Sequence, residues 1–228
     1  MNMELTAPGE IIAADRFVLR PLRPSDAGLL TLYAADKRVA EATTSIPHPL
    51  PPGAAEAFIA RSIAEDPDEV VWVMDASAGG GSELLGVISL KKMDRNQSEV
   101  GYWVAPAFWN TGFASEAVTA LVGDNPLGND AVFAAVFQDN PVSARVLTNA
   151  GFDYLGDAEA FSVARNAKVP TWTYIKKYRE MAGRVEAKVI HTARLTLRSP
   201  RPEDAPAVTA VLRDFDVARW LTQVPHPY

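Results

Sequence analysis

The stretch FWNTGFASEA, residues 108–117, lies where an expected strand (98–105) ends and an expected helix begins near Gly112. Glycine allows the backbone to turn tightly and to approach a ligand closely, and Asn110 is a residue type that tolerates positive φ. Free N–H groups at the start of a helix bind anions, helped by the helix dipole. The stretch is therefore either a plain tight turn or an anion-binding loop, and the remaining sequence has to decide.

Composition and charge narrow the classes of protein. The chain of 228 residues is 48% hydrophobic and 22% charged, which is ordinary for a globular protein. A net charge of −6 without any Lys/Arg-rich run argues against a nucleic-acid partner. No cysteine and only three scattered histidines make a metal site unexpected. No apolar run approaches the ~18 residues of a membrane span, and no signal pattern opens the chain. We expect a cytoplasmic protein without metal or membrane partner.

Apolar patterning predicts an alternation of strands and helices. A first helix is expected after Pro24 with Ser25 as its N-cap, and a buried-type strand is expected at residues 131–137, where apolar residues occupy both faces. The expected strands are 17–22, 70–74, 84–90, 98–105, 131–137, 153–163 and 171–178; later helices are expected at 54–64, 112–122 and 141–150. This order predicts an α+β class with a mixed, mostly antiparallel central sheet and helices on both faces.

The end of the chain repeats its beginning. Residues 194–228 align with residues 16–50 at a constant offset of 178, and 15 of the 35 aligned positions are identical. The repeated positions include Arg20/Arg198 and Asp26/Asp204. This is an internal repeat, whose second copy holds only the first strand and the helical part. We expect one complete domain at 1–180 and a partial second repeat at 181–228.

The partial repeat carries a large apolar set, which a lone strand and helix cannot bury alone. Its members are Val208, Val211, Leu212, Val217, Trp220 and Leu221. We expect the segment to dock on its own first domain or on that of a neighbour, with a homodimer as the favoured arrangement. The alternative is that the chain is a shortened version of a tandem protein.

Two motifs resemble the GNAT superfamily of acetyl-CoA-dependent N-acetyltransferases, and within it the ribosomal-protein N-terminal acetyltransferases. The resemblance covers residues 16–178. The family's pyrophosphate loop, Q/R-x-x-G-x-G/A, is matched by Trp109, Asn110, Thr111, Gly112, Phe113 and Ala114. Gly and Arg are more usual at the second and third positions, so this loop lacks a possible charged contact to phosphate. The helix motif N-x-x-S-x-R-V-L…G-F is matched by residues 140–147 and 150–152.

The resemblance implies a cofactor site for acetyl-CoA. In the family, the middle strands of the sheet splay apart at a bulge, and pantetheine pairs along the strand that corresponds to GYWV. Backbone N–H groups near Trp103 and Val104 would then polarise the thioester carbonyl. Asn140 would touch pantetheine, although its type and place also suit a helix N-cap. Ser143 would donate to the departing thiolate, unless it is an ordinary polar residue of a first helical turn.

The acceptor side is less specific. Glu99 is the candidate base, acting on the amine through water, and its plain alternative is a solvated strand end. A strong base is not essential for an α-amine, whose pKa of about 8 lies well below the roughly 10.4 of lysine. His48 belongs to a loop that borders the acceptor site in the family, where it lines the substrate or only shapes the loop. Trp172 and Tyr174 lie in the last hairpin, as substrate-lining or core residues.

The expected function is an N-acetyltransferase that moves an acetyl group directly from acetyl-CoA to a primary amine in a ternary complex. The acceptor is a protein N-terminus or a small-molecule amine, and the sequence leaves that choice open. Two other interpretations remain: a non-catalytic, regulatory GNAT-like module that binds acyl-CoA, and an α+β interaction domain that binds no CoA.

Overall fold

The structure is a computed structural model that describes residues 10–64, 66–178, 189–192, 194–198 and 201–218. The chain forms two compact units, Met1–Glu180 and Met181–Tyr228. Within the described ranges, no helix has both the length and the apolar character needed to cross a bilayer.

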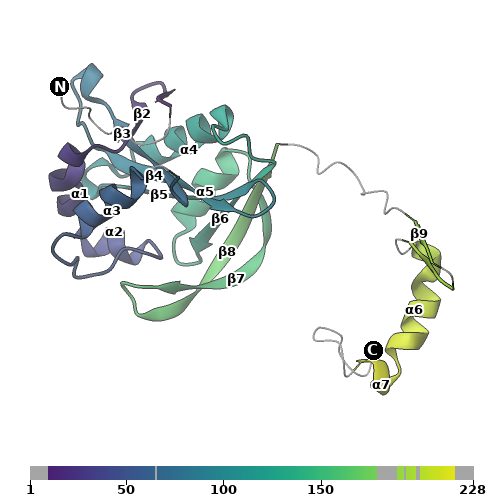
Figure 1. The fold of residues 1–228 in the computed structure, drawn as a ribbon. Coiled ribbons are helices and arrows are strands. Elements are labelled where there is room, and N and C mark those ends of the chain that lie inside the picture. Colours follow the sequence, from purple (N-terminus) through teal and green to yellow (C-terminus); the bar gives the residue numbers. More distant parts are fainter. Residues whose placement is uncertain (1–9, 65, 179–188, 193, 199–200, 219–228) are drawn as a thin grey trace. The chain divides into compact units, whose positions relative to one another are not determined.

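One eight-stranded sheet forms the centre of the first unit (Figure 1), with the order β1-β2-β3-β4-β5-β6-β8-β7. Neighbours pair antiparallel except β5 and β6, which are parallel. The α+β class and the mixed, mostly antiparallel sheet are therefore confirmed. The strands are β1 (Ile12–Ala13), β2 (Val18–Pro21), β3 (Glu69–Asp75), β4 (Gly86–Met93), β5 (Gln97–Val104), β6 (Ala131–Phe137), β7 (Asp153–Ser162) and β8 (Ala167–Lys177).

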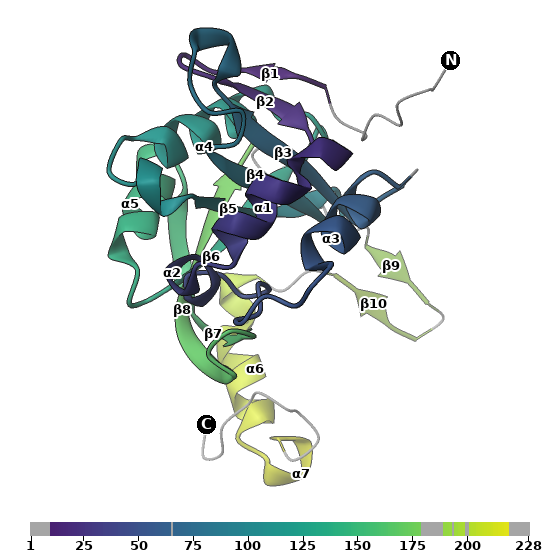
Figure 2. The same cartoon turned by 90° about the vertical axis from the view of Figure 1, so that its left-hand side faces the viewer.

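Helices cover both faces of this sheet, as expected (Figure 2). The helices of the first unit are α1 (Ala27–Ala34), α2 (Lys37–Glu41), α3 (Ala54–Ser62), α4 (Phe113–Asp124) and α5 (Pro141–Asn149). On one face, Leu30 of α1 and Ile59 of α3 pack with Val71, Val73 and Val87 of the sheet. On the other face, α4 and α5 pack over a larger core that contains Trp72 and Ile88. Because strand side chains alternate, residues 71, 73 and 87 face one helix layer, and residues 72 and 88 face the other.

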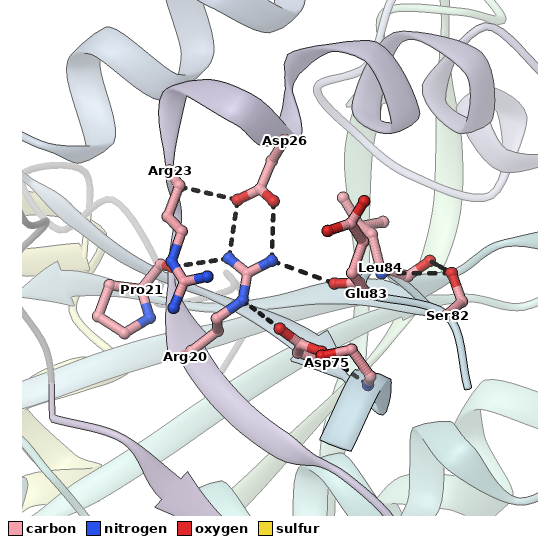
Figure 3. A network of polar contacts seen from close by, with 9 residues as sticks. Arg20, Pro21, Arg23, Asp26, Asp75, Ser82, Glu83 and Leu84 are labelled. Carbon is pink, nitrogen blue, oxygen red and sulfur yellow. Dashed lines mark hydrogen bonds and ion pairs between the residues drawn. The ribbon is translucent and has the colours of Figure 1, made fainter. Parts of the chain in front are cut away.

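A buried arginine joins the start of α1 to the sheet (Figure 3). The Arg20 guanidinium donates to both oxygens of Asp26 at 2.8 and 2.9 Å, to Asp75 of β3 at 2.5 Å, and to the carbonyls of Pro21 and Glu83. All five of its N–H donors are thereby used. Burial opposes the charge, but the hydrogen bonds to Asp26 and Asp75 outweigh it and raise the pKa of Arg20. The cluster fixes the angle at which the chain enters the first helix.

The predicted elements are mostly present, with three differences at the N-terminal end. Ser25 is not the cap of the first helix, because a short 3-10 turn (Pro24–Asp26) intervenes and the carboxylate of Asp26 accepts the N–H of Arg23. The short helix α2 and the two-residue strand β1 were not predicted. Both are too brief to show a hydrophobic period.

In the second unit the structure describes two strands and two α-helices, with a 3-10 turn (Pro202–Asp204) before the first helix: β9 (Ile190–His191), β10 (Thr196–Leu197), α6 (Ala205–Leu212) and α7 (Phe215–Ala218). Strands β9 and β10 pair antiparallel through Leu197↔Ile190, and β1 and β2 pair through Leu19↔Ile12, the same register at an offset of 178. The four elements reproduce β1, β2, α1 and α2 in order. Val208 and Val211 of α6 are exposed, whereas Trp220 and Leu221 of the predicted apolar set lie outside the described residues.

Candidate active site

The two parallel strands at the middle of the sheet separate after a short pairing. Strand β5 pairs with β6 only at Gln97↔Ala131, Ser98↔Val132 and Glu99↔Phe133. On its other edge, β5 stays in continuous register with β4 from Gln97 to Val104. The expected splay is therefore present, but without the expected bulge in β5. The result is a sheet whose two central strands present unpaired backbone edges to each other beyond Glu99.

Strand alternation decides which backbone groups of β5 face that opening. Ala105, next after the strand, donates its N–H to Leu85 on the β4 side. In a regular antiparallel pair consecutive residues point their N–H groups to opposite edges, so Val104 and Tyr102 direct theirs toward β6. Trp103 directs its own toward β4. Of the two expected donors, Val104 is therefore the one at the opening, and its carbonyl already accepts the Trp109 indole N–H at 2.7 Å.

The loop between β5 and α4 has the backbone of an anion-binding turn. Asn110 has φ of 60°, and Gly112 has φ of 85° as the cap of α4. No acceptor in the described part of the chain takes the N–H groups of Asn110 to Ala114. The side chain of Phe113 packs edge-to-face on Phe17 and Phe108, which holds the loop in place. The predicted positive φ at Asn110 is confirmed, and free donors cluster at the start of a twelve-residue helix.

The start of α5 adjoins the same opening. Asn140 caps this helix, since its side chain accepts the N–H of Ser143 at 3.3 Å. Ser143 is half-buried, and its hydroxyl contacts no partner in the described residues. Tyr102 of β5 reaches across to α5 and donates its hydroxyl to the carbonyl of Ser143 at 3.1 Å. Burial raises the pKa of Tyr102 to about 12, so it stays a neutral phenol at physiological pH.

A cavity of about 540 Å³ opens on the opposite face of β5, between the sheet and the α1/α3 layer. Its polar wall includes Glu99, Glu69 of β3 and Ser89 of β4. Ser89, on the strand next to that of Glu99, donates to Glu69, one strand further away, at 2.5 Å. Gly101, which has no side chain, forms the floor beside Ser89. Glu99, the predicted base, therefore lines this cavity at the point where β5 separates from β6.

The structure places the predicted acceptor-side residues either in an exposed loop or in the core. The loop of His48 contributes Ile46, Pro47 and Leu50 to the cavity, whereas His48 itself is exposed and does not line it. Trp172 and Tyr174 pack in the larger core on the other face of the sheet. The structure does not bring these three side chains into the cavity. On β8 only Thr171, which alternation turns the other way, lines it.

Sequence reasoning missed several residues that the fold places at the opening or the cavity. Tyr102 and Ser89 stand on strands that were predicted, and Glu69 comes directly before one, but their places at the opening or the cavity depend on the register between strands, which the sequence does not give. Arg16 was missed because its partner at the loop is about a hundred residues away in sequence. Within the described residues, no group of three or more His, Asp or Glu side chains is arranged to hold a metal ion.

The chain resembles known proteins in sequence and in fold. Residues 16–153 match the family described as the acetyltransferase (GNAT) domain. The uncharacterized N-acetyltransferase YoaA of Bacillus subtilis is 34% identical over 103 residues, which are 43% of this chain and 58% of YoaA. The uncharacterized N-acetyltransferase p20 of Bacillus licheniformis is 23% identical over 76% of this chain and 99% of its own.

Among solved structures, RimJ of Mycobacterium smegmatis, in complex with CoA-disulfide, superposes with a TM-score of 0.62 at 19% identity. The superposition covers 76% of this chain and 88% of RimJ. At that identity the likeness supports the fold alone. The family match covers more than half of the sequence, and the chain belongs to the GNAT acetyltransferase family.

Proposed function

We propose that this GNAT-family chain transfers an acetyl group from acetyl-CoA directly to a primary amine while both substrates are bound. The observation that carries the proposal is the separation of β5 from β6 after Glu99, which the anion-binding loop and the start of α5 adjoin. A cavity that can hold a second substrate lies on the opposite face of β5. The same strand thus serves a donor site and an acceptor site.

Acetyl-CoA would bind as a substrate at the opening. The free N–H groups of Asn110 to Ala114 hold its pyrophosphate, since a helix start offers aligned donors and a positive dipole end. The pantetheine arm pairs with the exposed edge of β5 in the manner of an added strand. Asn140, which caps α5, lies at the same opening and contacts the arm. Trp109 closes the loop on the strand through Val104.

The reaction needs an oxyanion donor, a proton acceptor and a donor to the leaving group. The amine nitrogen attacks the thioester carbonyl, and its C–N bond forms as the carbonyl oxygen gains negative charge beside the Val104 N–H. Glu99 takes the amine proton through a water molecule. The C–S bond then breaks, and the Ser143 hydroxyl donates a hydrogen bond to the departing CoA thiolate. The proposed reaction uses no metal and takes place in the cytoplasm.

The acceptor is a primary amine on a small molecule or a protein N-terminus. Support comes from the cavity, whose wall combines apolar loop residues such as Ile46 with the carboxylates of Glu69 and Glu99 and with the cations Arg61 and Lys91. The two carboxylates are acceptors for a group that arrives as an ammonium ion. The cavity does not by its shape select one amine.

Incubation of the purified chain with acetyl-CoA and a panel of amines tests the function, with release of free CoA thiol as the signal. The panel should include peptides with free N-termini, aliphatic polyamines and amino acids. We expect thiol release above the amine-free rate for at least one class. CoA binding without such release would instead favour the non-catalytic module, and absence of CoA binding would favour a plain interaction domain.

We further propose that the second unit is the beginning of a second GNAT repeat. Its described elements are counterparts of β1, β2, α1 and α2. Leu195, Leu197 and Val208 are 64%, 52% and 45% exposed, whereas their counterparts Phe17, Leu19 and Leu30 are at most 5% exposed. This apolar surface docks on another part of the protein, and we expect a homodimer.

A further inference from the structure

Arg16, just before β2, lies against the loop that is proposed to hold the pyrophosphate. Its Nη1 donates to the carbonyl of Thr111 at 3.0 Å. Its Nη2 is 3.5 Å from the place that a Cβ on Gly112 would occupy. The guanidinium carbon stands 4.2 Å from the centre of the Phe113 ring. A cation from a distant part of the chain is therefore fixed beside three consecutive residues of the loop.

Glu116, in the first turn of α4, binds the backbone and the Nε of this arginine. It accepts the Arg16 backbone N–H at 2.7 Å and the Nε–H at 2.6 Å. A guanidinium has five N–H donors, and these contacts together with Thr111 use two of them. One hydrogen of Nη1 and both of Nη2 find no acceptor in the described part of the chain. The Arg16 side chain is 47% exposed, so these donors are accessible.

We propose that Arg16 binds a phosphate group of CoA. The proposal rests on the function proposed above and adds a residue to its donor site. Residues 109–114 carry no charged side chain, so the loop itself supplies no charge for phosphate. A guanidinium binds phosphate oxygens with charge-assisted hydrogen bonds, in a fork that a lysine cannot reproduce. Arg16 brings such a fork to the loop from outside the motif.

The competing role for Arg16 is purely structural, as a tie between the start of β2 and α4. Glu116 separates the two roles. If the pair is only a tie, Arg16→Gln and Glu116→Gln break the same ion pair and should weaken CoA binding alike. If Arg16 contacts phosphate, Glu116→Gln keeps the cation and removes a nearby negative charge, so CoA should bind as well as before or more tightly.

Titration calorimetry of the full chain with CoA is the test, because it reads binding without activity. We expect Arg16→Gln to raise the Kd for CoA roughly 10- to 100-fold, Arg16→Lys to give a smaller rise, and Glu116→Gln to give none. Arg194 occupies the position equivalent to Arg16 in the second unit, so Arg194→Gln is the matched control and should leave the Kd unchanged. Circular dichroism checks that each variant is folded.

A second ligand identifies the phosphate. With 3′-dephospho-CoA, loss of the Arg16→Gln effect assigns Arg16 to the 3′-phosphate, and persistence of the effect assigns it to the pyrophosphate. The proposal is overturned if Arg16→Gln binds CoA like the unaltered chain, or if Glu116→Gln or Arg194→Gln weakens binding as much. An unaltered chain that binds no CoA would overturn the proposed function as well, which distinguishes the two failures.

Discussion

Arg198 donates to Asp204 the same pair of hydrogen bonds that Arg20 donates to Asp26. The distances are 2.6 and 2.7 Å in the second unit and 2.9 and 2.8 Å in the first. In both places the acid also accepts the N–H of the residue three positions before it. Their surroundings differ, because the Arg20 side chain is 3% exposed and that of Arg198 is 36% exposed. The pair thus sets the turn from strand to helix locally, and the first unit adds burial against β3.

This difference in burial predicts that equivalent mutations lower the free energy of unfolding strongly in the first unit and little in the second. Asp26→Asn should lower the free energy of unfolding of the first unit by about 3 kcal/mol or more, because it removes the charge partner of a buried guanidinium. The equivalent change Asp204→Asn lies at an exposed pair and should have little effect. Urea unfolding of both variants, followed by circular dichroism, makes the comparison. Equal losses would show that burial of Arg20 contributes nothing special.

The loop predicts a selective effect on one substrate. Gly112→Val should raise the KM for acetyl-CoA strongly, because φ of 85° strains a β-branched residue and the side chain would crowd both the phosphate and Arg16. The KM for the amine should change far less. A folded variant with an unchanged KM for acetyl-CoA would remove this loop from the donor site.

Ser143 is predicted to act on the leaving group. Ser143→Ala should lower kcat by roughly 10²-fold, as expected for one group that assists proton or charge transfer, and should leave the Kd for acetyl-CoA nearly unchanged. Tyr102→Phe is a useful comparison, since it removes the hydrogen bond to the Ser143 carbonyl and keeps the Ser143 hydroxyl. A Ser143→Ala enzyme with normal kcat would exclude the hydroxyl from the mechanism.

The second unit is predicted to dock through its apolar face and to form the contact of a homodimer. Light scattering of the full chain and of a version that ends at Glu180 should show a dimer for the former and a loss of dimer for the latter. The reason is the exposure of Leu195, Leu197 and Val208, an apolar set too large for a free surface. Two monomers of equal activity and stability would make the unit a passive remnant.

The sequence predicted the parts of this structure that depend on local pattern. Strand β6 was expected at its observed bounds because seven apolar residues in a row leave little choice, and φ at Asn110 followed from the turn chemistry of asparagine and glycine. The motifs around Gly112 and Ser143 indicated the family, and the comparisons show that family.

What the sequence could not supply depends on distance in the chain. Arg16 and Glu116 are joined across 100 residues, and no local period reports such a pair. Trp172 lies on the face of the sheet away from the cavity, whereas its neighbour Thr171 lines it. Which of the two faces the cavity depends on strand register, since a shift of one residue exchanges the two faces of a sheet. The unbroken register between β5 and β4 shows that β5 lacks the expected bulge. Glu69 and Ser89 enter the cavity through that same register.

The central claim is direct transfer from acetyl-CoA to an amine within one ternary complex, and initial-rate kinetics test it most directly. Acetyl-CoA and the best amine of the panel are varied together, and release of free CoA thiol is measured. The account predicts double-reciprocal lines that intersect, with no burst of thiol when the amine is left out. Parallel lines with an amine-independent burst would contradict it, because they indicate an acetylated enzyme, and absence of any amine-dependent release would contradict the enzymatic function itself.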